Sequence, residues 1–139
     1  MSREYFSGVE REDLGATAAR EITWRRMTAS YSPRQYAVPP ATFGKARDIA
    51  WRNTDLSERD RERLYASQIQ HEVAFQINAA LQQLRWTQAD YAREAKMTAQ
   101  RIGAVLRGAV PMRLEDLGVA RRIFNIHTTV VHRDSLGRQ

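Results

Sequence analysis

The spacing of apolar positions predicts a long helix in the middle of the chain. Residues 57–84 contain neither Gly nor Pro, and their apolar side chains recur every three to five positions. These side chains are Leu64, Ile69, Val73, Ile77, Ala80, Leu81 and Leu84. Such spacing places them on one face of a helix, and Ser57 followed by Asp60 is a capping-box-like start. We expect one helix here, or two nearly continuous helices that break near residues 66–67.

The residues before this helix predict a smaller helical extension. Residues 10–29 show a ragged helical pattern, and three prolines make residues 30–40 a connector, because proline lacks a backbone donor and restricts the preceding residue. Pro40 then begins a short helix that reaches about Asn53. Aromatic residues alternate here with arginines: Trp24, Tyr31, Tyr36, Phe43 and Trp51 with Arg25, Arg26, Arg34, Arg47 and Arg52. We favour packing of these aromatic rings against the long helix, with a second DNA-contacting surface as the alternative.

The C-terminal end combines a helix with a segment of different character. Residues 114–124 carry an apolar stripe, with arginines in the last turns, where cations suit the helix dipole. Residues 128–131 are β-branched and predict a short strand, and residues 134–139 read as a loose tail.

Charge and composition indicate what kind of partner we expect this protein to bind. The 139 residues suffice for one ordinary domain, or for a small domain with an extension. The 22 Lys and Arg residues exceed the 16 Asp and Glu residues, which gives a net charge of +6. Residues 85–139 hold 10 of the basic and 5 of the acidic side chains, so most of the excess lies there. This distribution favours a polyanionic partner.

Other classes of protein find little support in the sequence. The absence of cysteine excludes disulfides and thiolate zinc sites. No apolar run reaches the length of a membrane span or a signal-peptide core, so we expect a soluble, cytoplasmic protein without a membrane partner. His71, His127 and His132 lack ligand spacing, and we interpret them as solvated or capping residues. No catalytic motif is present, so we expect neither an enzyme nor a bound cofactor or metal.

The most informative segment is WTQADYAREAKMTAQRIGAVLRG, residues 86–108. Thr87 can cap a helix that begins at Gln88, with Asp90 at the third helical position. Thr98 can cap a second helix in the same way. Two short helices joined by a tight turn are therefore predicted.

The remaining residues of this segment suit a close crossing of the two helices. Ala92 must be small where the helices meet, because a larger side chain would force them apart. Ile102 and Val105 are three positions apart and face the first helix, while Met97 fills the turn.

This segment resembles the helix-turn-helix of the Cro and phage-repressor family. It aligns with that pattern without a gap, through Gln88, Ala92, Ile102, Val105 and the closing Arg107-Gly108. A weaker resemblance extends from about residue 68 to residue 126. It implies an all-α fold.

The resemblance also implies a division of the chain. A four- or five-helix Cro/repressor-like DNA-binding domain would span residues 57–126. Residues 1–56 would form an N-terminal helical extension, and residues 127–139 a short strand or tail.

Particular contacts with DNA follow from the resemblance, because such proteins place the first turn of the second helix in the major groove. Gln100 would pair with adenine and Arg101 with guanine, each by two hydrogen bonds. The expected base-contacting residues are Ala99, Gln100, Arg101, Gly103 and Ala104. The expected phosphate-contacting residues are Thr87, Gln88, Lys96, Thr98, Arg107 and Arg113.

Two residues depart from the family pattern. Lys96 stands at the turn position where Gly is usual, and a positive φ there costs a non-glycine residue about 1 kcal/mol. A phosphate contact would offset that cost. Ala99 replaces a polar base-reading residue, so specificity would rest on Gln100 and Arg101.

We therefore expect a sequence-specific, double-stranded DNA-binding regulator of transcription, in family terms a repressor of a phage, prophage or plasmid promoter. Such domains often pair on palindromic sites, and the sequence leaves both a homodimer and a monomer open. The alternative is a protein-interaction module, such as an antitoxin or anti-regulator, that keeps the helix-turn-helix as a scaffold.

Overall fold

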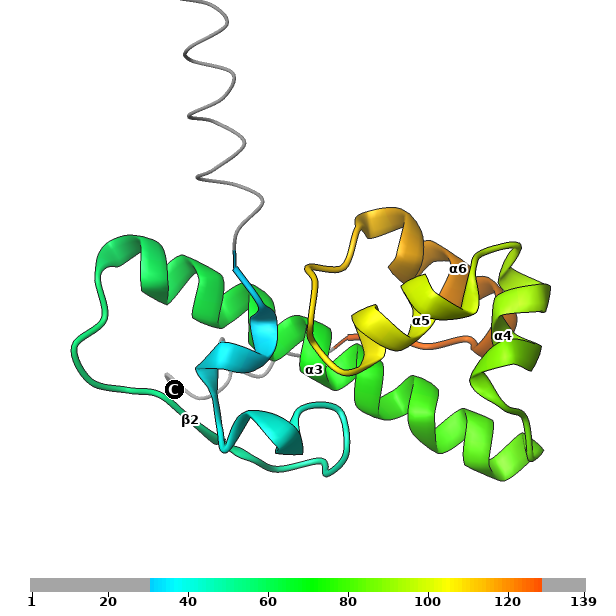
Figure 1. Ribbon diagram of the computed structural model, residues 1–139, viewed down its shortest axis with the longest axis horizontal. Helices are drawn as coiled ribbons and strands as arrows, with labels where there is room; N and C mark the ends of the chain where they lie inside the picture. The colour runs from blue at the N-terminus through cyan, green and yellow to red at the C-terminus, as the bar shows by residue number, and fades with distance from the viewer. Residues whose placement is uncertain (1–30, 129–139) are drawn as a thin grey trace, which may run out of the picture. The chain divides into compact units, whose positions relative to one another are not determined.

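The computed structural model describes residues 31–128, and these residues are mostly helical (Figure 1). The helices are α3 (Glu58–Leu84), α4 (Gln88–Ala95), α5 (Ala99–Leu106) and α6 (Leu114–Phe124). Two 3-10 turns, η1 (Pro33–Tyr36) and η2 (Pro40–Thr42), and two short strands, β1 (Ala37–Val38) and β2 (Ala50–Trp51), precede them. The helix predicted over residues 10–29 lies outside the described residues.

The predicted long helix is confirmed as one continuous element. The backbone N–H of Asp60 donates to Ser57 Oγ (3.1 Å), and the Asp60 carboxylate accepts from the Ser57 N–H (3.3 Å). Helix α3 does not break near residues 66–67, and the buried Ser67 hydroxyl donates to the Arg63 carbonyl within the helix (2.7 Å). The helix ends at Arg85, which has a left-handed backbone with φ 57°.

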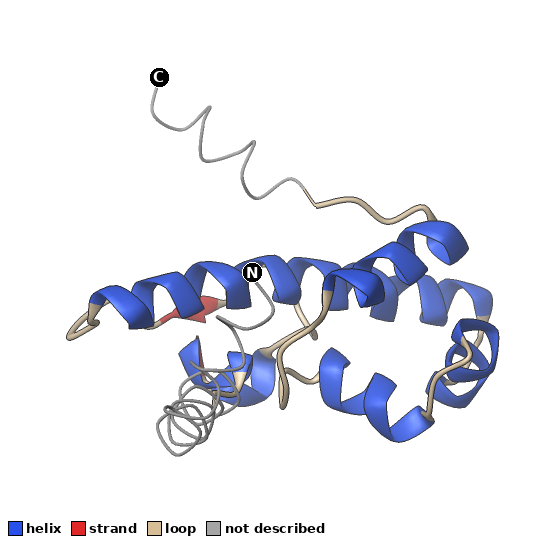
Figure 2. Cartoon of the chain, turned by 90° about the horizontal axis from the view of Figure 1, so that it is seen from above, coloured by secondary structure: helices blue, strands red, loops and turns tan. Residues whose placement is uncertain are grey.

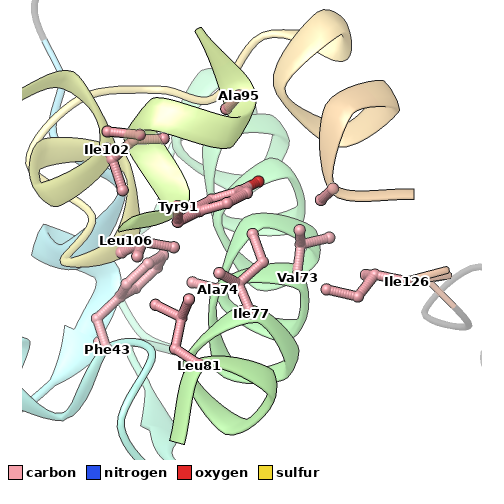
Figure 3. Packing of buried hydrophobic residues seen from close by; sticks show 13 residues of the cluster. Phe43, Val73, Ala74, Ile77, Leu81, Tyr91, Ala95, Ile102, Leu106 and Ile126 are labelled. Atoms are coloured by element: carbon pink, nitrogen blue, oxygen red, sulfur yellow. The ribbon is translucent and has the colours of Figure 1, made fainter. Parts of the chain in front are cut away.

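One face of α3 forms the floor of the hydrophobic core (Figure 3). Figure 2 shows α3 as a long helix with the shorter helices beside it. Its buried apolar residues are Val73, Ala74, Ile77 and Leu81, and the other elements add Ala37, Phe43, Tyr91, Ala92, Ala95, Ile102, Leu106, Ala120 and Ile126. Leu64, Val73, Ile77 and Leu81 of the predicted apolar stripe are buried, whereas Ile69 and Ala80 are half-buried and Leu84 at the end of the helix is 50% exposed.

The short helix predicted between Pro40 and Asn53 is wrong. Only Pro40–Thr42 is helical, as a 3-10 turn, and the chain then runs irregularly to β2. Strand β2 pairs with β1 in antiparallel register, Ala37 opposite Trp51. Gly44 has φ +73°, and its N–H donates to His71 of α3 rather than to a helical carbonyl. Tertiary hydrogen bonds thus replace the helical ones that the proline predicted.

The compact unit that contains the helices begins before residue 57, where the predicted DNA-binding domain starts. The chain divides after Tyr31, and residues 32–56, here called the N-terminal strap, belong to the same compact unit as the helices. Tyr36 and Phe43 are almost completely buried, so their interpretation as core residues is confirmed. The strap also bonds the end of α5, since the Arg34 N–H donates to the Gly108 carbonyl (3.0 Å).

His71 and Asn78 of α3 fasten the middle of the strap. His71 Nδ1 accepts from the Gly44 N–H (2.9 Å), so Nε2 carries the ring proton and donates to the Arg47 carbonyl (3.1 Å). Asn78 donates to the Gly44 carbonyl (2.9 Å). His71 is buried, with Phe43 and Trp51 edge-on to its ring, and is not the solvated or capping residue that the sequence suggested.

A tyrosine joins the start of the strap to the start of α3. The Tyr36 hydroxyl donates to Asp60 Oδ1 (2.8 Å). This bond holds the pKa of the Asp60 carboxyl below its ordinary value. The guanidinium of Arg52 lies over the Tyr36 ring, 5.4 Å from its centre.

The chain leaves α6 through Asn125, which has a left-handed backbone, and buries Ile126 beside α3. Residues 125–128 form no strand, and the rest of the predicted strand lies outside the described residues. Within residues 31–128, no helix combines the length and the apolar character that a membrane span requires.

The strap contact at Gly44 predicts a large effect of a small substitution. A Cβ atom at Gly44 would lie 2.6 Å from the Leu106 carbonyl oxygen, and φ is +73°. We expect Gly44→Ala to lower the free energy of unfolding in urea by at least about 2 kcal/mol. Gly118→Ala is the control, because nothing lies within 4 Å of its added Cβ, and it should stabilise the protein by up to about 1 kcal/mol. Equal effects of the two variants would contradict the strap contact.

Candidate nucleic-acid interface

Two threonine caps define α4 and α5, as predicted. The Asp90 N–H donates to Thr87 Oγ1 (3.1 Å), and the Thr87 N–H donates to the Asp90 carboxylate (2.8 Å). The latter bond is the main reason that the pKa of Asp90 lies below its ordinary value. The Arg101 N–H donates to Thr98 Oγ1 (3.1 Å), so α5 begins at Ala99.

A left-handed residue makes the turn between the two helices. Lys96 has φ 58° and ψ 43°, and the Met97 N–H beyond it donates to the Ala92 carbonyl (2.9 Å). The Lys96 side chain is exposed. The positive φ anticipated at this non-glycine position is confirmed.

The helices cross through small and branched apolar residues. Ala92, Ile102 and Val105 are each 4% exposed, which confirms their predicted inward orientation. Tyr91 closes the other side of α4, with its ring 5.0 Å from that of Phe124. Burial raises the pKa of Tyr91 to about 12. The face opposite these residues is left to solvent.

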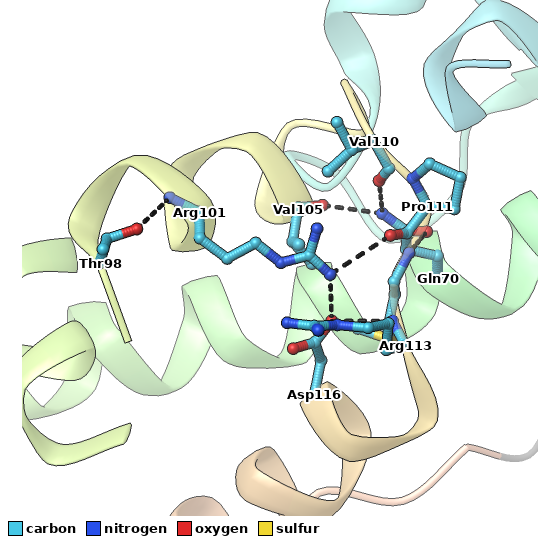
Figure 4. Close-up of polar contacts among 9 residues, drawn as sticks. Gln70, Thr98, Arg101, Val105, Val110, Pro111, Arg113 and Asp116 are labelled. Carbon is cyan, nitrogen blue, oxygen red and sulfur yellow. Dashed lines mark hydrogen bonds and ion pairs between the residues drawn. The ribbon is translucent and has the colours of Figure 1, made fainter. Parts of the chain in front are cut away.

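The side chain of Arg101 is directed toward α6. Its guanidinium Nη2 donates to Asp116 Oδ2 of α6 (2.7 Å) and approaches the Pro111 carbonyl (3.5 Å), as Figure 4 shows. The two side chains are 26% and 8% exposed, and Arg101 Nε is buried without a partner. The guanidinium of Arg101 is committed to a largely buried ion pair, so the predicted contact with a base would require it to leave Asp116.

Gly103 is likewise not open to a ligand. It is buried, and a Cβ atom added there would lie 3.0 Å from Arg107 Nη1 and 3.1 Å from Gln88 Oε1. Two side chains predicted to contact phosphate therefore lie close together above Gly103. The lack of a side chain at Gly103 makes room for Gln88 and Arg107, and the predicted contact with a base would require these two side chains to move aside.

The other predicted residues fall into two groups. At the first turn of α5, Thr98, Ala99 and Gln100 are exposed, and Ala104 one turn later is half-buried. Around the helix ends, the exposed residues are Thr87, Gln88, Lys96, Arg107 and Arg113. Arg113 lies apart from Gln88, beside Asp116, with Nε 4.0 Å from Oδ2.

Gln70 positions the loop between α5 and α6, and the sequence reading missed it. Its Nε2 donates to the carbonyls of Val105 (2.9 Å) and Val110 (3.0 Å), and its Oε1 accepts from the Met112 N–H (2.7 Å). Gln70 is 4% exposed. A polar residue three positions before Val73, on the apolar face of α3, was the available signal.

Among residues 31–128, no three His, Asp or Glu side chains gather in a group able to hold a metal ion. Comparisons of the chain with protein-family models, with curated proteins and with solved structures gave no match.

The ion pair between Arg101 and Asp116 predicts a loss of stability when it is broken. We expect Arg101→Met to lower the free energy of unfolding by about 2 kcal/mol, because it leaves the buried Asp116 carboxylate without its guanidinium. The control is Arg93→Met, which breaks the exposed Arg93–Asp90 pair, with side chains 75% and 36% exposed. That change should cost less than about 0.5 kcal/mol. If both variants lose an equally small free energy of unfolding in urea, the ion pair does not stabilise the fold and Arg101 stays a candidate for base reading.

Proposed function

We propose that this protein is a sequence-specific, double-stranded DNA-binding regulator of transcription. The observation that carries the proposal is the orientation of α4 and α5 about the Lys96 turn, which is the orientation that a helix-turn-helix would need. Ile102 and Val105 are buried, while Ala99 and Gln100 at the start of α5 are exposed. A helix that presents its first turn in this way can enter the major groove.

The proposed backbone contacts lie at the start of α4. Gln88 is the first residue of α4, where unpaired N–H groups and the helix dipole favour an anion. The guanidinium of Arg107 lies close to the Gln88 amide above Gly103. A phosphate held by these groups would fix the position of α5 in the groove without reading sequence.

Base reading then falls mainly on Gln100. Its amide can donate to adenine N7 and accept from the adenine N6 amino group at the same time. Adenine alone among the four bases offers this pair of groups in the major groove. The methyl groups of Ala99 and Ala104 suit contact with a thymine methyl. Because Arg101 is withdrawn to Asp116, guanine loses its expected partner. We propose that the half-site read by α5 is rich in A·T pairs.

The family resemblance extends the proposal to repression of a phage, prophage or plasmid promoter. One observation favours the alternative of a protein-interaction scaffold. The first turn of α5 exposes a single long polar side chain, Gln100, between small residues, and such a surface also suits a protein partner.

Selection of binding sites from random duplexes separates the two functions. A DNA reader should yield an A·T-rich consensus, and a scaffold should yield none, with weak binding governed by salt alone. Gln100→Ala should then lower the preference for the selected site over random duplex by about 1–3 kcal/mol. Gln83→Ala, on the exposed surface of α3, is the matched control and should leave the preference unchanged. An unchanged preference in Gln100→Ala would refute the assignment of this residue.

Gly103→Ala should change stability and DNA binding in opposite directions. Alanine favours the helix by up to about 1 kcal/mol over glycine. Its Cβ displaces only the ends of Gln88 and Arg107, which can swing into solvent. We expect a higher melting temperature and weaker binding to selected and random duplexes alike. Gly118→Ala should give the stabilisation alone, and a Gly103→Ala protein with unaltered affinity would exclude the Gln88–Arg107 pair from the contact.

A further inference from the structure

The strap brings a lysine to the edge of the proposed DNA-binding surface. Lys45 directly follows Gly44, which is bonded on both sides, its N–H to His71 and its carbonyl to Asn78. The Lys45 N–H itself donates to the Thr42 carbonyl (3.0 Å). The backbone that carries the Lys45 side chain is therefore fixed against α3.

Lys45 shares an open groove of about 550 Å³ with the proposed phosphate contacts. The groove runs between the strap, the C-terminal half of α3 and the ends of α4 and α5. Its polar lining residues are Lys45, Asn78, Gln82, Gln88 and Arg107, and its apolar lining residues include Phe75 and Trp86. The strap and the helix-turn-helix thus meet at one surface, although Lys45 lies far from Gln88 in the sequence.

The two charged side chains that line the groove, Lys45 and Arg107, are both basic. Lys45 and Arg107 are both exposed, and no Asp or Glu lines the groove. Among the ion pairs of residues 31–128, none involves Lys45 or Arg107. Two cations beside the exposed amide side chains of Gln82 and Gln88 form a surface complementary to a phosphodiester chain.

We propose that Lys45 binds a backbone phosphate of the same duplex that α5 reads, so that the strap is part of the DNA-binding surface. This inference rests on the proposed function. A strand whose phosphate lies at Gln88 and Arg107 would continue along the groove toward Lys45. The contact adds affinity without sequence preference, because a lysine ammonium bonds phosphate oxygens as a point charge.

The test is the salt dependence of duplex binding by the full chain. Replacing Lys45 with Gln should reduce the slope of log K against log[salt] by about 0.9, the value for one phosphate contact. The affinity deficit of K45Q should then shrink about 3.5-fold between about 50 and about 200 mM salt. The loss should be equal for selected and random duplexes, and K45R should retain the wild-type slope.

The matched control is Arg121→Gln, which removes the same charge from an exposed position on α6 outside this groove. An unchanged slope in K45Q would overturn the inference, and so would an equal decrease in R121Q, which would indicate a general effect of net charge. If wild-type protein prefers its selected site while K45Q keeps the full slope, only this inference fails. If wild-type protein binds no duplex, the proposed function fails with it. Circular dichroism of each variant checks that the exposed substitutions leave the fold intact.

Discussion

Burial of one face of α3 holds the described elements together. Its apolar residues supply a surface to which the strap, α5 and α6 are all packed, and burial of that surface is the main favourable term. Apolar contacts alone tolerate several arrangements, because they have no direction. Gln70 and His71, side by side on the same helix, restrict them by hydrogen bonds to carbonyl and N–H groups of the other segments. The polar residues of α3 therefore decide where the loop after α5 and the strap lie.

Two glycines allow those segments to approach each other closely. A side chain at Gly44 would meet the Leu106 carbonyl, and a side chain at Gly108 would meet the Phe43 ring, at 2.6 and 2.7 Å. Both residues also have positive φ, which glycine adopts at little cost. The strap is thus seated directly against the end of α5. This contact joins the stability of the fold to the position of Lys45 and Arg107 at the proposed interface.

At the proposed interface, Arg101 makes a structural contact, whereas Arg107 is placed for the proposed binding. Arg101 is directed inward to a buried carboxylate on α6, whereas Arg107 extends over Gly103 into solvent. The inward arginine orients α5 against α6, and the outward arginine is free for phosphate. Such a division leaves few side chains for direct base reading, so much of the proposed affinity would come from sequence-independent backbone contacts. Sequence preference would then depend on Gln100 and on the small residues around it.

Features that depend on neighbours along the chain could be predicted before the fold was known. The starts of α3, α4 and α5 could be predicted because Ser57, Thr87 and Thr98 bond N–H groups three residues away. The apolar stripe of α3 and the inward orientation of Ile102 and Val105 followed from helical period alone. The orientation of Arg101, the surroundings of Gly103 and the conformation after Pro40 depend instead on tertiary contacts. Arg101 finds its carboxylate on another helix, and Gly44 finds its bonding partners on α3 and its close contact at the end of α5. Hydrogen bonds and steric contacts between distant segments leave no pattern in the local sequence. The position of the strap and the inward orientation of Arg101 could therefore not be predicted from the sequence.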